Sequence, residues 1–269
     1  MAPAERVAIG DGVELAYRRW RAGGDPVVLV HGLGGRKEFW EDVAGRLAAA
    51  DHDVIAIDMR GAGDSDRPPG PYSVEGWARD LIELVAAVGL VRSVLIGHSV
   101  GCMVVEQAAL ALGERCAAVA MLGGTISWPE GFEGAAAERA RLARAGRLRE
   151  VGAAVAAGGL TQAAHAERPE LVERFLELFC ANDPEGYAES ALATARGAML
   201  EPQRVACPAL AVAGEEDAVT PPSAAAQIAA AMPRGRSAEV PGGAHWCHFE
   251  RPGPVSDCLR TFLQAAAIG

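Results

Sequence analysis

A serine between two glycines, in the pentapeptide Gly97–Gly101 (GHSVG), has the residue types of a hydrolytic nucleophile. The pattern G-x-S-x-G is informative only in context. Here a short apolar run, Ser93–Ile96, precedes it, and a helix-like segment, Met103–Leu112, follows it. A serine on such a strand-to-helix turn is held in a strained conformation that projects its hydroxyl above the sheet. We therefore predict that Ser99 is a nucleophile; the alternative is an ordinary glycine-rich turn.

A serine hydroxyl is a poor nucleophile until a base accepts its proton. His245 lies in the loop GGAHW, after a predicted last strand, Ser237–Val240, and before a predicted last helix, Val255–Leu263. This position puts it at the carboxyl ends of the strands, the same edge as Ser99. His248 is the alternative base, and we favour His245.

The base needs a carboxylate that fixes its tautomer and stabilises its charged form. Three acidic residues, Glu215, Glu216 and Asp217, come after Gly214, which follows the apolar run Pro208–Ala213 directly. They lie between the serine and the histidine in the chain, which is the order expected for a hydrolase on a sheet of this kind. Their position alone does not decide which of the three residues is the acid that pairs with the base.

Acyl transfer also requires two donors for the charge that develops on the substrate oxygen. One is expected to be the backbone N–H of Val100, directly after the nucleophile. The other is expected in the loop His31–Gly35 (HGLGG), which ends the run Pro26–Val30, and we choose the N–H of Leu33. A plain tight turn at these glycines is compatible with the same role.

The order of the elements indicates an α/β fold with a mostly parallel, doubly wound sheet. Apolar runs without alternation are typical of strands covered on both faces, and helix-like segments separate them. The runs are Pro26–Val30, Asp53–Ile57, Ser93–Ile96, Ala117–Leu122 and Pro208–Ala213, after a hairpin of Arg6–Ile9 and Val13–Arg19. Residues 125–203 break the alternation and are mostly helical. We predict a core of residues 1–124 and 204–269, interrupted by a helical insertion of residues 125–203.

Taken together, the motifs resemble the α/β-hydrolase superfamily. They are HGLG at 31–34, DMRGAGDS at 58–65, GHSVG at 97–101, G-x-x-D at 214–217 and GAHW at 243–246. The resemblance implies a Ser99–His245–Asp217 triad, which decides among the three acids. It also implies no metal, no organic cofactor and a cap formed by the insertion. Residues 66–90 look like those of 3-oxoadipate enol-lactonases and simple esterases, although Cys102 stands where a third glycine is common. Related enzymes with an aspartate nucleophile are disfavoured by Ser99.

Some residues are weaker candidates. His31, Trp40, Trp128 and Trp246 are candidates for the substrate pocket, because ligand pockets are usually apolar and aromatic; core packing is an equal alternative for the tryptophans. Five arginines that crowd one predicted helix of the insertion are suited to steering an acidic substrate, but a solvated face is favoured. They are Arg139, Arg141, Arg144, Arg147 and Arg149. Structural ion pairing is favoured for Arg60, and a buried, unreactive thiol for Cys102.

Composition restricts the partners. The 269 residues carry a formal net charge of −10, which disfavours nucleic acid and anionic membrane surfaces. No signal peptide or membrane span is predicted, and the six cysteines lack zinc spacing, so we expect a cytoplasmic protein with a small-molecule substrate.

The expected reaction is hydrolysis of a carboxylic ester, in particular a small lactone or enol-lactone. Alternatives are C–C bond hydrolysis, thioester cleavage, perhydrolysis, a biosynthetic tailoring step, or a non-enzymatic receptor.

Overall fold

The computed structural model describes residues 3–267, and within them eight strands form one sheet in the order β1-β2-β4-β3-β5-β6-β7-β8. β1 pairs antiparallel with β2, and β2 with β4; the remaining pairs are parallel. The bounds are β1 Ala4–Ala8, β2 Glu14–Trp20, β3 Pro26–Val30, β4 Asp53–Ile57, β5 Ser93–His98, β6 Cys116–Leu122, β7 Ala209–Gly214 and β8 Gly235–Val240. The chain ends at residues 1–2 and 268–269, which the predicted core includes, lie outside the described residues.

The strand order reverses at β3, which has β4 on one side and β5 on the other. Chains leaving neighbouring parallel strands at such a point diverge to opposite faces and open a crevice at the carboxyl ends. The loop after β3 and the turn after β5 are the two segments that the sequence singled out for the oxyanion donors and the nucleophile. The topology therefore places them beside each other.

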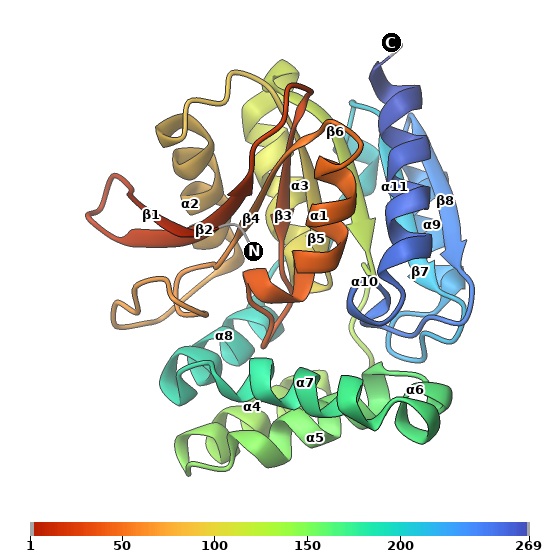
Figure 1. Cartoon of the computed structure of the whole chain (residues 1–269). Coiled ribbons are helices and arrows are strands. Elements are labelled where there is room, and N and C mark those ends of the chain that lie inside the picture. Colours follow the sequence, from red (N-terminus) through yellow and green to blue (C-terminus); the bar gives the residue numbers. More distant parts are fainter. Residues whose placement is uncertain (1–2, 268–269) are drawn as a thin grey trace.

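Helices cover both faces of the sheet (Figure 1). α1 and α11 pack on one face, with Val43 and Leu259 in the same apolar cluster. α2, α3 and α9 cover the other, where Leu81, Val104 and Ile228 share a second cluster. The bounds are α1 Glu41–Ala48, α2 Val74–Ala87, α3 Val100–Leu112, α9 Pro222–Ala231, α10 Cys247–Glu250 and α11 Pro252–Ala267, with 3-10 turns η1 Lys37–Trp40, η2 Gly113–Arg115 and η3 Pro202–Arg204.

Between β6 and β7 the described chain contains five helices and no strand. Figure 1 shows these helices grouped together below the sheet. They are α4 Phe132–Arg144, α5 Leu148–Gly159, α6 Gln162–Glu167, α7 Pro169–Cys180 and α8 Pro184–Arg196. Their apolar faces meet in a third cluster, which includes Phe175 and Phe179 and reaches Phe39 and Trp246 of the core. The division into separate core and cap domains stays a prediction.

The predicted sheet is confirmed strand by strand, with ends shifted by one or two residues in most cases. The helix-like segment between β3 and β4 consists of the turn η1 followed by the helix α1. Among the described residues, no helix combines the length and the apolar character needed to cross a bilayer.

Candidate active site

Ser99 occupies the sharp turn between β5 and α3, with φ +53° and ψ −120°. Positive φ is strained for a residue with a side chain. Its backbone N–H donates to the carbonyl of Leu122 across 2.8 Å, which fixes the turn to β6. The flanking glycines are required by contact, since a Cβ on Gly97 would collide with the carbonyl of Gly101, and one on Gly101 would lie 2.7 Å from that of His31. The predicted turn therefore has a steric cause.

Asp217 and His245 are brought together from the ends of β7 and β8. Nδ1–H of His245 donates to Oδ2 of Asp217 across 3.0 Å, and both side chains are buried. The same oxygen accepts the hydroxyl of Thr220 at 2.9 Å, while Oδ1 of Asp217 accepts the backbone N–H groups of Val219 and Thr220, each at 2.8 Å. A carboxylate with four donors is held in one orientation. With the proton on Nδ1, Nε2 of His245 is free to act as a base, in the cavity that Ser99 also lines.

The alternatives for the base and the acid lie elsewhere. His248 is completely buried, its ring 4.2 Å from Trp40 and 4.3 Å from His98. Burial lowers the pKa of His248 to about 3, so it stays neutral. Glu215 and Glu216 are exposed, and Glu215 accepts the N–H of Gly242 at 2.9 Å. The geometry selects His245 and Asp217 as the buried pair.

The loop after β3 lies directly against the nucleophile. A Cβ on Gly32 would come within 2.9 Å of the Cβ of Ser99. Among the described residues, no acceptor pairs with the backbone N–H of Leu33 or of Val100. Both residues line one small cavity, and Val100 is the first residue of α3, so its N–H has no partner in the helix. Two free amides therefore flank Ser99.

A buried ionic network holds this loop. Lys37 is fully buried, and its Nζ contacts Asp58 at 2.7 Å, Asp64 at 2.5 Å and Glu38 at 3.1 Å. Burial favours the neutral amine, but the three carboxylates outweigh it and raise the pKa of Lys37. Asn182, in the turn between α7 and α8, donates to the carbonyl of Gly34 at 3.0 Å and accepts the N–H of Gly63 at 2.9 Å. The predicted oxyanion loop is thus fixed from the core and from the insertion.

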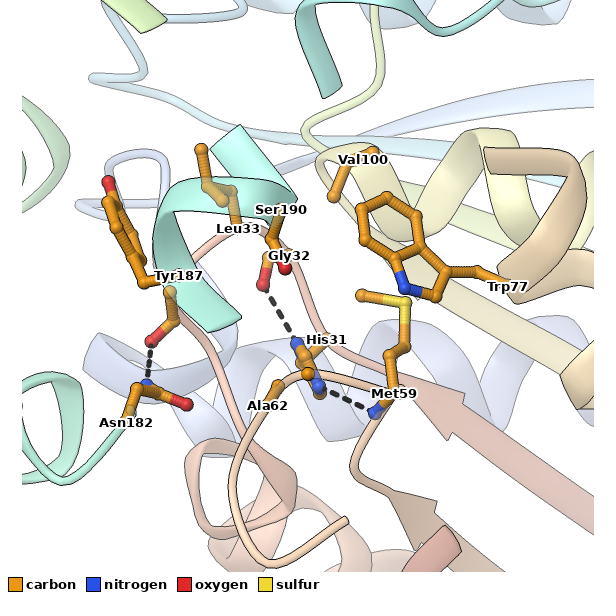
Figure 2. Close-up of a pocket in the computed structure, with 12 residues that line it drawn as sticks. His31, Gly32, Leu33, Met59, Ala62, Trp77, Val100, Asn182, Tyr187 and Ser190 are labelled. Atoms are coloured by element: carbon orange, nitrogen blue, oxygen red, sulfur yellow. Dashed lines mark hydrogen bonds between the residues drawn. The ribbon is translucent and has the colours of Figure 1, made fainter. Parts of the chain in front are cut away.

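Two cavities meet near Ser99 and share the lining residues Leu33 and Tyr187. The larger, of about 630 Å³ including its mouth, lies between the core and the insertion. Its lining residues are Leu33, Ser99, Trp128, Phe132, Arg139, Ala154, Val155, Gly158, Gly159, Tyr187, Thr194, Val219, His245 and Trp246. The smaller, of about 290 Å³, is shown in Figure 2, where Val100, Trp77 and Met59 lie on one side and Tyr187 and Asn182 on the other.

Three of the four predicted pocket residues line these cavities. Trp128, stacked 4.1 Å from Phe132, and Trp246 line the larger one. His31 lines the smaller one, where its Nε2 accepts the N–H of Met59 at 3.0 Å and its Nδ1 donates to the carbonyl of Gly32 at 2.8 Å (Figure 2). Both ring nitrogens are occupied, so His31 shapes the loop.

Residues 25–252 match a family described as "alpha/beta hydrolase fold". The chain belongs to this family. Over 272 residues it is 28% identical to a protein of Klebsiella pneumoniae provisionally named carbamate hydrolase RutD, covering 94% of this chain and 96% of that one. A solved esterase of Thermogutta terrifontis, with malate bound, has a TM-score of 0.91 at 25% identity, covering 98% of this chain and 99% of that one. The enol-lactonase of Burkholderia xenovorans LB400 has a TM-score of 0.87 at 26% identity, and the match covers 97% of this chain and 100% of that one.

The expected resemblance to the superfamily, and to its enol-lactonases and esterases, is therefore confirmed, and the chain is a hydrolase. Arg60 of this hydrolase makes the expected structural pairs, with Asp80 at 2.5 Å and Asp11 at 2.8 Å. Cys102 is completely buried, and burial raises the pKa of its thiol, so it is an unreactive core residue.

Trp40, the fourth candidate for the pocket, is not among the residues that line either cavity, and it has the alternative position in the core that the sequence left open. It is fully buried in the cluster on the α1 and α11 face, against the ring of His248, and so belongs to the core of the hydrolase. Trp40 is the last residue of η1, and its ring packs on the face of the sheet that α1 and α11 cover. Phe39, the residue before it, packs against the insertion. The sequence shows two adjacent aromatic residues but not which one faces which layer.

Sequence reasoning also missed four residues of the site. Thr220 and Asn182 make the hydrogen bonds described above, and Tyr187 lines both cavities. Gly123, directly after β6, has φ +62°, and a Cβ there would lie 2.9 Å from Cε1 of His245. A glycine at the carboxyl end of a predicted parallel strand is a usable signal, and so is a threonine three residues after the acid, because the bonds between Thr220 and Asp217 are local. The positions of Asn182 and Tyr187 depend on helix packing, which no local pattern encodes.

Proposed function

We propose that this hydrolase cleaves carboxylic esters, small lactones and enol-lactones in particular, with Ser99 as nucleophile. His245 is the general base and Asp217 orients it. One observation carries the proposal: Ser99, on its strained turn, and His245, which is paired with the buried Asp217, line the same cavity. This is the arrangement that activates a serine hydroxyl.

In the first half of the reaction, the Oγ of Ser99 attacks the ester carbonyl carbon while Nε2 of His245 takes the hydroxyl proton. The N–H groups of Leu33 and Val100 donate to the oxyanion. Asp217 stabilises the imidazolium. Collapse of the tetrahedral intermediate breaks the C–O bond, His245 returns the proton to the departing oxygen, and an acyl-enzyme on Ser99 remains.

In the second half, His245 takes a proton from a water molecule, which attacks the acyl carbon. Breakdown of the second intermediate releases the carboxylic acid and restores the hydroxyl of Ser99. With a lactone, the departing oxygen stays attached to the acyl group, so the product is one hydroxy acid. An enol-lactone gives an enol that becomes a ketone.

The helical insertion serves as a cap in this proposal. Trp128, Phe132 and Val155 from the insertion line the larger cavity together with Ser99 and His245. A cap of this kind shields the reacting ester from water and limits the size of the substrate. The esterase and the enol-lactonase with similar structures support the ester and lactone classes.

Carbamate cleavage is a second candidate, favoured by the name of the relative from Klebsiella pneumoniae. The same attack on a carbonyl carbon applies, with an amine or alcohol departing. Comparison of the kcat/KM values for a matched ester, lactone and carbamate separates the two candidates. A coloured dienone acid added to this panel tests C–C bond hydrolysis.

Replacement of the nucleophile tests the proposal directly. Ser99→Ala is expected to keep its circular dichroism spectrum and to lose at least about 10³-fold in kcat on a 4-nitrophenyl ester. Ser223→Ala, an exposed serine on α9, is the control and should match the wild type. A fluorophosphonate probe should label the wild type and not the Ser99 variant. Unchanged ester turnover in Ser99→Ala would refute the assignment, and labelling without turnover would favour a receptor.

A further inference from the structure

Arg139 differs from the other four arginines of the insertion. Each of those makes an ion pair on the exposed surface, which confirms the expected solvated face for them. The pairs are Arg141 with Glu138, Arg144 with Glu185 and Glu189, Arg147 with Glu150, and Arg149 with Glu173. Arg139 is half-buried, lines the larger cavity, and has no carboxylate within ion-pair distance in the described part of the chain.

The lining of that cavity provides donors and no carboxylate. No aspartate or glutamate is among its lining residues. Three further lining groups are buried donors without a hydrogen-bond partner: Nε1 of Trp128, Nε1 of Trp246 and the hydroxyl of Tyr187. Buried polar groups are normally paired, and these three donors belong to side chains that line one cavity, which favours a ligand with acceptor atoms.

Tyr187 stays a donor throughout the physiological range. Burial raises its pKa to about 12, and the positive charge of Arg139 is a smaller, opposing influence. Tyr187 and Arg139 both line the larger cavity. A planar guanidinium with a neighbouring hydroxyl suits a carboxylate, whose two oxygens accept several donors at once.

We propose that Arg139 is a specificity-determining residue, which binds a free carboxylate on the substrate while Ser99 attacks the ester carbonyl in the same cavity. The substrate is then a short ester or lactone that carries a second, ionised carboxyl group. This inference rests on the proposed function and adds the substrate class. It also separates Arg139 from the surface arginines with which the sequence groups it.

The test uses pairs of 4-nitrophenyl esters whose acyl chains end either in a carboxylate or in a methyl group. Hemiesters of succinic, glutaric and adipic acid are each compared with the neutral alkanoate of the same length, with the Ser99→Ala reaction subtracted as background. The wild type should prefer the hemiester in at least one pair. In Arg139→Gln the ratio of kcat/KM for the hemiester to kcat/KM for the neutral ester should fall at least about 10-fold, mainly through KM, the scale of a lost charge-assisted hydrogen bond. Arg139→Lys should recover part of the ratio.

Arg144→Gln is the matched control, because Arg144 lies on the same helix and makes exposed pairs; its ratio should equal that of the wild type. A preference of the wild type for the neutral ester at every length would overturn the proposal, as would an unchanged ratio in Arg139→Gln. If neither ester shows turnover that depends on Ser99, the proposed function fails instead. Binding of glutarate to Ser99→Ala, followed by tryptophan fluorescence with and without Arg139→Gln, then tests the carboxylate site alone.

Discussion

His98, the residue before the nucleophile, connects the two loops of the proposed triad. Its Nε2–H donates to the backbone carbonyl of His245 across 2.9 Å, and the two ring centroids lie 4.9 Å apart. Complete burial lowers the pKa of His98 well below its usual value, with His248 and His245 acting in the same direction. The ring therefore stays neutral and keeps this donor. The residue positions the loop of the base and takes no proton itself.

Gly123 provides a sharp prediction at the same scale. Gly123→Ala places a methyl group 2.9 Å from Cε1 and 3.1 Å from Nδ1 of His245, so the imidazole must shift from the position in which it donates to Asp217. We expect kcat on a 4-nitrophenyl ester to fall at least about 10-fold, since small misplacements of catalytic groups have large effects. Gly89→Ala is the control: φ there is +79° and nothing lies within 4 Å, so it carries the backbone strain without the contact. Equal rates in both variants would contradict this role.

At the scale of elements, one side chain joins three segments. Asn182 is buried in the turn between α7 and α8, and it bonds the carbonyl of Gly34, the N–H of Gly63 and the carbonyl of Phe179. Gly34 and Leu33 share a loop, so the insertion helps to position a proposed oxyanion donor. The contact runs from the insertion to two separate loops of the core.

Asn182→Ala should therefore change both stability and catalysis. Loss of the side chain leaves buried backbone groups unpaired, at about 1–3 kcal/mol, which lowers Tm by about 2–4 °C for each kcal/mol in a chain of this size. We also expect a lower kcat with little change in KM, because the oxyanion loop loses a support. Ser256→Ala, which removes a buried hydroxyl from α11, is the control and should lower Tm alone. A kcat equal to that of the control would show that Asn182 is only structural.

The elements differ in how far the sequence predicts them. The central strands are covered on both faces, so runs such as Val27–Val30 must be apolar throughout, and that composition is visible in the chain. The motif loops are equally visible, because the turn at Ser99 needs its glycines. The sequence predicts a helical insertion, but it does not predict that Arg139 and Tyr187 of this insertion line the larger cavity. Their positions depend on how α4 and α8 pack against the core, and amphipathic helices of this kind fit several arrangements.

The net charge of the whole molecule is a poor guide to the charge within its cavity. The value of −10 weighs against an anionic substrate when it is considered alone. In the structure, surface carboxylates neutralise arginines locally, as in the pairs of α4 and α5. Exposed pairs contribute little to stability and are screened by salt. Arg139 lines the larger cavity, makes no ion pair among the described residues, and is the charge that would act on a bound substrate at short distance in our proposal.

Stability of the whole chain should depend on pH through one buried acid. Glu106 on α3 is 3% exposed, and its carboxylate accepts the N–H of Glu201 at 3.0 Å. Burial outweighs this bond and raises the pKa of Glu106 from 4.5 to about 7. Above about pH 7 both the folded and the unfolded chain carry the ionised carboxylate. The full free-energy cost of burying this charge then lowers the free energy of unfolding. The cost decreases as the pH falls towards 4.5, below which both states are protonated.

Glu106→Gln keeps an oxygen that accepts the N–H of Glu201 and removes the charge. The variant should therefore be more stable than the wild type at pH 8.5, by about 1–3 kcal/mol from a shift of this size, and the gain should be much smaller at pH 5. Urea unfolding at the two pH values measures the difference. Glu114→Gln, at an exposed position before β6, is the control and should show no such dependence. A gain of the same size at both pH values would contradict the titration of Glu106 and leave only a packing effect of the amide.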